Sequence, residues 1–120
     1  MKKIFIVDDS YFIREMLKTI LSKENYIIAG EAADGYEAIE KLQTVETDLV
    51  TLDIAMEHMD GLQTLERLIE YSPEMKIVMC SAMGQKPIVK DALEKGARDF
   101  IVKPFTSSKV LETIKKVIEN

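Results

Sequence analysis

Cysteine, histidine, proline and long apolar runs are all scarce in this chain of 120 residues. A single cysteine excludes a disulfide within the chain and suits a reducing compartment, so we expect a cytoplasmic protein. A single histidine excludes multi-histidine metal sites and histidine-based catalytic pairs. No uninterrupted apolar run is longer than four residues, which is far too short to cross a membrane. We therefore expect neither a disulfide-rich secreted domain nor a membrane protein.

Length and charge limit the number of domains and the kinds of partner. The length suits one domain, spanning residues 1–120, with no output domain after it. The net charge of −5 argues against a nucleic-acid partner, because affinity for phosphate backbones depends on clustered lysine and arginine. The charge is uneven: residues 1–85 carry −8 and residues 86–120 carry +3. The positive segment could meet an acidic partner, or its lysines could simply keep two surface helices soluble.

Five short segments rich in isoleucine and valine predict β-strands. Each is nearly continuous in apolar residues rather than alternating, which is typical of strands that are buried on both faces. The five segments are Ile4–Val7, Tyr26–Ala29, Leu49–Leu52, Ile77–Cys80 and Phe100–Val102.

Helical spacing of apolar residues predicts a helix after each strand. The first begins near Ser10 and carries an apolar row through Phe12, Met16 and Ile20 together with Ile13, Leu17 and Leu21. The others lie near Tyr36–Leu42, Leu62–Ile69, Ile88–Leu93 and Val110–Ile118. This alternation predicts an α/β fold: a single doubly wound (βα)5 domain, with a parallel five-stranded sheet between two layers of helices. The common strand order for such a sheet is 2-1-3-4-5, which opens a ligand crevice at the carboxyl ends of strands one and three.

Polar residues stand at the carboxyl ends of four predicted strands. Asp8 and Asp9 end the first strand, Asp53 the third, Ser81 the fourth and Lys103 the fifth. Taken singly, each has an ordinary structural explanation, such as capping of the next helix by Asp8 or Asp9. Together, three carboxylates at one sheet edge repel one another and require either raised pKa values or a bound cation.

The chemistry of this set favours Mg²⁺ and a phosphoryl group. Hard oxygen ligands suit Mg²⁺, which needs only one or two protein carboxylates and often bridges to phosphate oxygens. A carboxylate can itself act as a nucleophile and form an aspartyl phosphate. Lys103 would supply positive charge to the phosphoryl oxygens, and Ser81 could donate a hydrogen bond to one of them. We therefore expect a carboxylate that accepts a phosphoryl group with the help of Mg²⁺.

These residues resemble the receiver domain of two-component response regulators, and single-domain chemotaxis regulators most of all. The resemblance covers nearly the whole chain, and its five motifs stand in register at the strand ends. They are Ile4-Phe5-Ile6-Val7-Asp8-Asp9-Ser10, Asp53-Ile54-Ala55-Met56, Met59-Asp60-Gly61, Cys80-Ser81-Ala82-Met83-Gly84 and Lys103-Pro104-Phe105.

The resemblance implies a role for each matching position. Asp53 matches the phosphorylated aspartate, and Lys103 matches the lysine that pairs with the phosphoryl group. Asp9 matches the direct Mg²⁺ ligand, with Asp8 acting mainly through water, and Ala55 matches the position whose backbone carbonyl completes the metal shell. The remaining matches are Ser81 as the switch hydroxyl, Phe100 as the aromatic switch residue and Lys103-Pro104 as a peptide bond that is usually cis in this family.

Two positions depart from the usual family pattern. Met56 is followed by Glu57 instead of proline, which frees the backbone of the loop after the third strand. Phe100 replaces the commoner tyrosine and therefore has no hydroxyl to hold its ring outward.

The resemblance implies a monomeric signalling switch rather than an enzyme that turns over a separate substrate. Its partners would be a histidine kinase of the CheA type as donor and a flagellar motor switch protein or adaptor as target. Ala55 and Met83 cannot orient a hydrolytic water, so we also expect an auxiliary phosphatase. The expected partner surface carries Lys86, Lys90, Phe100 and Lys109.

Four other functions remain as alternatives. A single-domain phosphorelay intermediate would pass the phosphoryl group to a histidine of another protein. A phosphatase of the haloacid-dehalogenase type would need its nucleophile on the first strand, and a flavodoxin-like carrier would need a hydroxyl-rich loop where Asp8 and Asp9 stand. A binding module that is never phosphorylated would not need the full set of acids, hydroxyl and lysine.

Overall fold

Five parallel strands form one sheet in the order β2-β1-β3-β4-β5, as the computed structural model of residues 1–120 shows. The predicted strand order is therefore confirmed. The strands are β1 (Lys3–Val7), β2 (Ile27–Ala32), β3 (Leu49–Asp53), β4 (Ile77–Ala82) and β5 (Asp99–Lys103). The helices are α1 (Tyr11–Ser22), α2 (Gly35–Leu42), α3 (Gly61–Tyr71), α4 (Lys86–Glu94) and α5 (Ser107–Glu119).

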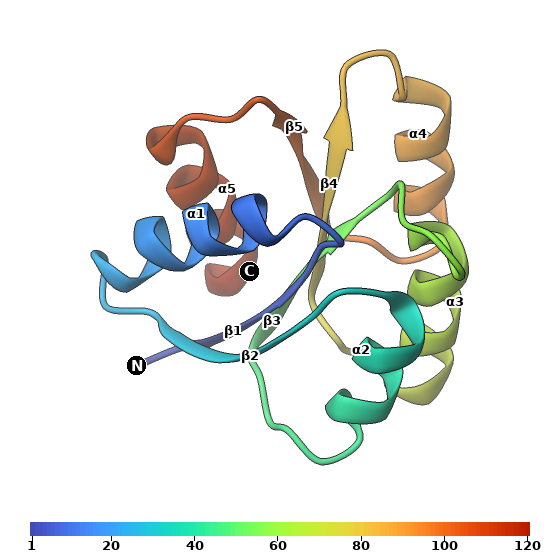
Figure 1. The fold of residues 1–120 in the computed structure, drawn as a ribbon, viewed down its shortest axis with the longest axis horizontal. Helices are drawn as coiled ribbons and strands as arrows, with labels where there is room; N and C mark the ends of the chain where they lie inside the picture. Colours follow the sequence, from blue (N-terminus) through green and yellow to red (C-terminus); the bar gives the residue numbers. More distant parts are fainter.

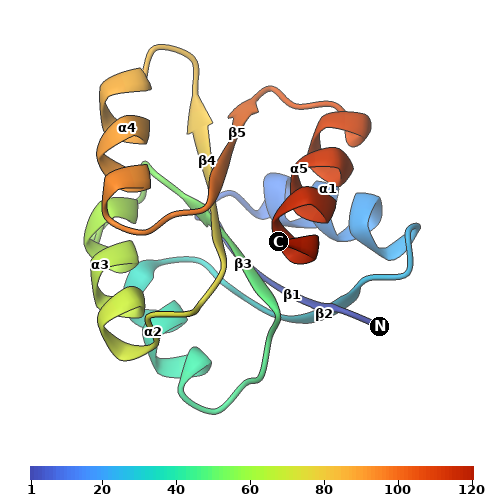
Figure 2. The same cartoon turned by 180° about the vertical axis from the view of Figure 1, so that it is seen from behind.

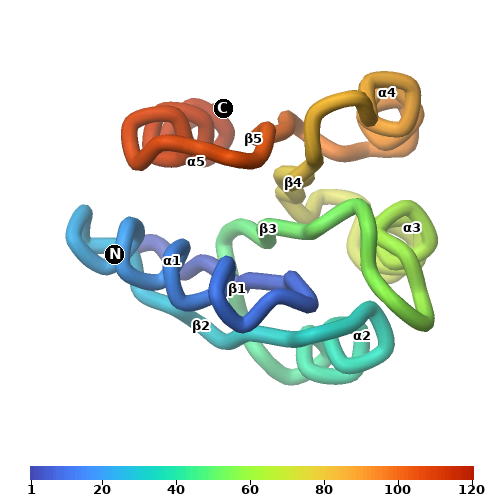
Figure 3. Tube along the Cα trace, turned by 45° about the horizontal axis from the view of Figure 1, so that its top comes forward, coloured from blue at the N-terminus to red at the C-terminus, as the bar shows by residue number.

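Two layers of helices enclose the sheet. Helices α1 and α5 cover one face, and α2, α3 and α4 cover the other (Figures 1 and 2). The view in Figure 3 separates these layers most clearly. Each face has its own apolar core, because alternate residues of a strand point to opposite sides. Ile4 and Ile6 of β1 pack on the α1 and α5 side, whereas Phe5 and Val7 pack on the side of the other three helices.

The two edge strands are less buried than the sequence pattern predicts. The central strand β3 is buried along its whole length, but most residues of β2 and β5 are partly or fully exposed. Phe100 and Val102 of β5, for example, keep 36% and 38% of their surface exposed. The prediction that the strands are buried on both faces is thus correct for the centre of the sheet and wrong for its edges. An edge strand has a neighbouring strand on one side only.

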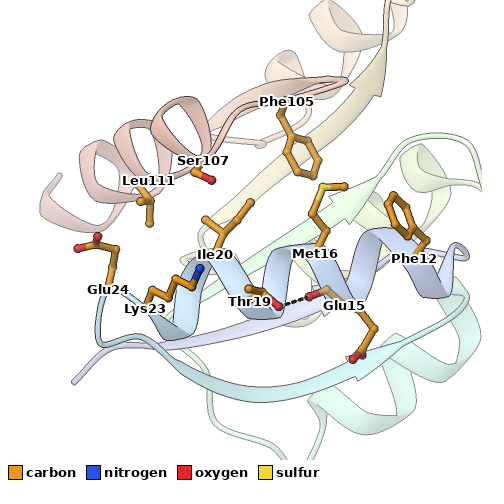
Figure 4. A pocket seen from close by; sticks show the side chains of 10 residues that line it. All are labelled: Phe12, Glu15, Met16, Thr19, Ile20, Lys23, Glu24, Phe105, Ser107 and Leu111. Atoms are coloured by element: carbon orange, nitrogen blue, oxygen red, sulfur yellow. Dashed lines mark hydrogen bonds between the residues drawn. The ribbon is translucent and has the colours of Figure 1, made fainter.

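The apolar row predicted on α1 divides into a buried part and an open part. Leu17 and Leu21 are completely buried, but Phe12 is 69% exposed. Figure 4 shows Phe12, Met16 and Ile20 along one wall of a groove between α1 and α5, with Phe105 before α5 on the opposite wall. Phe12, Met16 and Ile20 therefore line the groove, and of these three Ile20 also packs against the core that holds Leu17 and Leu21.

Side chains other than Asp8 and Asp9 cap four of the helices, and α4 has no side-chain cap. The Ile13 amide donates to the Ser10 hydroxyl at the start of α1, over 3.2 Å. Asp60 and Gln63 form a reciprocal capping box at the start of α3. The alternative explanation of Asp8 and Asp9 as helix caps is therefore wrong, and both carboxylates are left for the site.

None of the five helices has both the length and the apolar composition needed to cross a membrane.

Candidate functional site

Three carboxylates meet at the carboxyl edge of the sheet. Asp8 and Asp9 follow β1, and Asp53 is the last residue of the neighbouring strand β3. One oxygen from each of the three lies within 4.8 Å of the others. The structure therefore brings together the acids that the sequence analysis grouped, because parallel strands end at the same edge.

Asp8 and Asp9 differ in how firmly they are held. Asp8 is 1% exposed; its carboxylate accepts the Ser10 amide over 2.9 Å and the Lys103 ammonium over 2.9 Å. Asp9 is exposed, and no hydrogen bond or ion pair engages its carboxylate. A free, exposed carboxylate beside two buried ones suits the predicted role of Asp9 as a direct metal ligand.

Burial makes Asp53 a weaker acid than usual. It is 5% exposed, and burial, together with the charge of Asp8, raises the pKa of its carboxyl from 3.8 to about 6, although Lys103 opposes the shift. The Ala55 amide lies 3.4 Å from one oxygen of this carboxylate. Asp53 therefore remains mainly ionised at neutral pH, as a nucleophile must be.

Lys103 is the cation that joins the two buried acids. It ends β5, two strands away from Asp53, and its ammonium lies 2.9 Å from Asp8 and 3.3 Å from Asp53. Burial alone would lower the pKa of Lys103, but the contacts with the two carboxylates outweigh burial and raise it. The side chain is thus fully charged at neutral pH and stands beside the proposed nucleophile. The peptide bond from Lys103 to Pro104 is cis, as predicted.

The remaining predicted residues lie on β4, on β5, in the loop after β3 and on the two last helices. Ser81 is buried near the end of β4, one residue beyond Cys80, which pairs with Asp53 across the strands. Phe100 lies further from the edge on β5 and is 36% exposed. Ala55 is exposed in the loop after β3. Of the expected partner surface, Lys86 and Lys90 on α4 and Lys109 on α5 are all exposed.

The structure adds three residues that the sequence analysis did not connect to the site. Gly61 begins α3 so close to β3 that an added Cβ would lie 2.3 Å from the Asp53 carbonyl oxygen. Arg14 of α1 donates to the Asp8 carbonyl and pairs with Glu31 of β2. The motif Met59-Asp60-Gly61 includes the glycine but does not predict its contact with the backbone of Asp53. Nothing in the sequence links Arg14 to Glu31 across 17 positions.

The donor set fits a hard divalent cation. Ionised carboxylates only accept hydrogen bonds, so three of them within 4.8 Å lack any attraction for one another without a cation. Lys103 compensates part of this charge at Asp8 and Asp53 but does not contact Asp9. Mg²⁺ prefers oxygen ligands and needs only one or two protein carboxylates, because it usually keeps several waters. The site therefore suits Mg²⁺ and offers Asp9 and Asp53 as the carboxylates to hold it.

Comparison with known proteins identifies the class. The family model of the response regulator receiver domain matches residues 4–115, and the chain belongs to this family. Within the family it is the receiver domain of a CheY-like response regulator. The chemotaxis protein CheY of Thermotoga maritima is 47% identical over 116 residues, which cover 97% of each chain. The chemotaxis protein CheY of Listeria monocytogenes is 48% identical and covers 97% of this chain and 98% of its own.

A solved structure shares both the fold and a large part of the sequence. The crystal structure of the CheX-CheY-BeF3-Mg²⁺ complex from Borrelia burgdorferi superimposes with a TM-score of 0.93 at 41% identity. The match covers 97% of this chain and 88% of that one. Receiver domains bind Mg²⁺ at an acidic site, and the cluster of Asp8, Asp9 and Asp53 is the acidic site of this chain.

Proposed function

We propose that this protein is a signalling switch that accepts a phosphoryl group on Asp53 with the help of Mg²⁺. The observation that carries the proposal is the contact of one lysine, Lys103, with both Asp8 and Asp53 inside a cluster of three carboxylates. A structural ion pair needs one carboxylate. Three carboxylates and a lysine at the switch point of a doubly wound sheet suit a charged ligand instead.

The proposed reaction transfers a phosphoryl group from a phosphohistidine or a small phosphoramidate. An oxygen of the Asp53 carboxylate attacks phosphorus, a P–O bond forms, the P–N bond breaks, and the leaving nitrogen takes its proton from solvent. Bound Mg²⁺ would offset negative charge on the phosphoryl oxygens. Lys103 supplies a second positive charge there, and the Ala55 amide, already 3.4 Å from Asp53, offers a neutral donor. The protein promotes its own modification and turns over no separate substrate.

The proposed output is a change in affinity for a partner protein. The expected surface on α4, β5 and α5 is exposed and carries Lys86, Lys90 and Lys109 around Phe100. The CheY relatives are chemotaxis proteins, which supports a kinase of the CheA type as donor and a flagellar motor switch protein or adaptor as target, within the cytoplasm. The Borrelia complex holds a CheY protein with CheX, which supports a further protein partner, and we propose a phosphatase in that position.

A phosphorelay intermediate is the second candidate. Asp53 would then pass its phosphoryl group to a histidine on another protein, so the same site would serve both functions. Rapid transfer from the phosphorylated protein to a histidine phosphotransfer domain would favour the relay. Phosphorylation-dependent binding to a motor protein without transfer would favour chemotaxis.

Mass spectrometry after incubation with phosphoramidate tests the phosphorylation site. We expect one phosphoryl group on the wild-type protein with Mg²⁺, little with EDTA, and none on Asp53→Asn. Glu57→Gln is the matched control, because this acidic residue is exposed in the loop after β3 and belongs to no contact of the site. Equal phosphorylation of wild type and Asp53→Asn would show that another residue is the acceptor.

A further inference from the structure

Arg14 joins the acid cluster to the edge strand β2. It lies in the first turns of α1, and only 14% of its side chain is exposed. One terminal nitrogen donates to the Asp8 carbonyl oxygen over 2.7 Å, and Nε donates to the Glu31 carboxylate over 2.8 Å. Glu31 holds the guanidinium in place, and the guanidinium in turn holds the main chain at Asp8.

The carbonyl that Arg14 holds belongs to the peptide unit that joins Asp8 to Asp9. A peptide unit is planar, so fixing its oxygen also fixes the direction in which the chain enters Asp9. The other anchors act elsewhere: the Asp8 amide donates to the Ala32 carbonyl over 3.1 Å, and Lys103 and the Ser10 amide hold the Asp8 side chain. Asp9 has no side-chain partner of its own, so its position depends on the peptide before it.

An arginine suits this place for a geometric reason. Its planar guanidinium offers several donors in a rigid fork and can reach two acceptors on different elements at once. Glu31 has a second partner, the ammonium of Lys18 one turn further along α1. Lys18 contacts Glu31 and Glu15 but no atom of Asp8 or Asp9. The two basic residues therefore share Glu31 as an acidic partner, but only Arg14 contacts the site. Arg14 also lies over the Tyr11 ring, 5.8 Å from its centroid, and Lys18 also pairs with Glu15.

We propose that Arg14, anchored by Glu31, is a positioning residue that preorganises Asp9 for the divalent cation. The inference rests on the Mg²⁺ site of the proposed function. Removal of a group that orients a metal ligand without binding the metal itself commonly lowers metal affinity by about 10–100-fold. Without Arg14, the peptide before Asp9 rotates more freely, and binding of the cation must first restrict it.

Calorimetric titration with MgCl₂ tests this on the intact protein. We expect Arg14→Met, which keeps length but loses all donors, to weaken Mg²⁺ binding about tenfold. Lys18→Met is the matched control and should bind Mg²⁺ within about twofold of wild type, because it leaves the Asp8 carbonyl contact in place. Arg14→Lys, with a single ammonium for two acceptors, should fall between wild type and Arg14→Met.

Thermal unfolding with and without Mg²⁺ separates positioning from general stability. A purely structural role would lower the midpoint equally in both conditions, whereas a positioning role reduces the rise in the midpoint that Mg²⁺ produces. Glu31→Gln, which leaves Arg14 in place with a weaker anchor, should show a smaller change in the same direction. The inference about Arg14 is overturned if Arg14→Met binds Mg²⁺ as tightly as wild type, or if Lys18→Met loses as much Mg²⁺ affinity as Arg14→Met. Either result would leave the proposed metal site untouched. A wild-type protein that binds no Mg²⁺ overturns the proposed metal site as well.

Discussion

The raised pKa of Asp53 makes stability depend on pH in a defined direction. In the folded protein the carboxyl titrates at about 6, against 3.8 as its usual value, mainly because it is buried. Between these values the folded state keeps a proton that the unfolded chain has lost, so stability falls as pH rises through this window. The cost disappears as pH falls below 3.8, where both states become protonated, and is complete once pH is well above 6.

Replacement of Asp53 by asparagine should remove this cost. We expect Asp53→Asn to be more stable than wild type by on the order of 1–3 kcal/mol at pH 7 without Mg²⁺. The difference should decrease steadily toward pH 4, where most of it is lost. Urea unfolding in EDTA buffers from pH 4 to pH 7.5 measures it, with Glu57→Gln as a control that shows no such trend. If the stability gain of Asp53→Asn instead grew toward acid pH, it would contradict a raised pKa for Asp53.

The two neighbouring acids after β1 should differ in their contribution to metal binding. Asp8 is already engaged by Lys103 and the Ser10 amide, whereas Asp9 is exposed and free. We expect Asp8→Ala to weaken Mg²⁺ binding by on the order of tenfold, as for a residue acting through water, and Asp9→Ala to weaken it further. Calorimetric titration of both variants decides the order. If Asp8→Ala binds more weakly than Asp9→Ala, the two roles are reversed.

At the scale of the elements, α3 begins close to the end of β3. The Gly61 amide donates to the Ile54 carbonyl over 2.7 Å, and a Cβ at Gly61 would lie 2.3 Å from the backbone oxygen of Asp53. Backbone cannot move aside as a flexible side chain can. Any larger residue must therefore push the start of α3 away from the end of β3 or displace Asp53.

Gly61→Ala should reduce both stability and phosphorylation. We expect a loss of about 1–3 kcal/mol, typical of overpacking, and a slower reaction with phosphoramidate. Gly35→Ala is the matched control, since its Cβ would meet the side chains of Thr64 and Met59 rather than the end of β3. It should lose stability but keep most of its phosphorylation rate. Urea unfolding and timed mass spectrometry measure the two effects, and equal rates for both variants would contradict a specific effect on Asp53.

The periodic pattern of the chain predicted element type and order but not exposure. The continuous apolar runs correctly indicated five parallel strands, yet β2 and β5 are half open. Burial of a strand depends on its place in the sheet, which a local pattern does not record. Phe12 shows the same limit: its helical spacing is regular, but the row that it begins faces an open groove (Figure 4).

The acid cluster was predictable because topology brings strand ends together. Asp8, Asp9 and Asp53 could be grouped as soon as the strands were read as parallel. Arg14 and Gly61 could not, because their roles depend on contacts of the backbone. Every residue has a backbone carbonyl, so a sequence does not show that the carbonyls of Asp8 and Asp53 make these contacts. Site residues that act through the main chain therefore appear only in the structure.

At the scale of the whole molecule, the proposed switch must connect Asp53 to a surface on α4, β5 and α5. Phe100 is only 36% exposed, so full burial of its ring would gain about 0.5–1 kcal/mol, a third of the value for a fully exposed side chain. Shifting a two-state equilibrium from 1:99 to 99:1 requires about 5.5 kcal/mol. The ring alone therefore cannot drive the change, and contacts of Ser81 and Lys103 with the phosphoryl group must supply most of it.

Ser81→Ala should consequently separate modification from output. Ser81 lies on β4, in register with Val102 of β5, so a displacement at its hydroxyl reaches the strand that carries Phe100. We expect Ser81→Ala to accept a phosphoryl group on Asp53 at a rate within a few-fold of wild type, because the three acids of the cluster and Lys103 all remain. Phosphorylation should then increase its affinity for an acidic, partly apolar partner peptide much less than it does for wild type.

Fluorescence anisotropy of a labelled motor-switch peptide, with and without beryllofluoride, measures that increase. Lys109→Ala is the complementary variant: this exposed lysine pairs with Glu112 and makes no contact with the acid cluster, so its loss should weaken peptide binding in both states while the ratio between them stays close to wild type. If phosphorylated Ser81→Ala binds the peptide as tightly as phosphorylated wild type, the hydroxyl does not couple the site to the surface, and the coupling must pass through Lys103 and β5 instead.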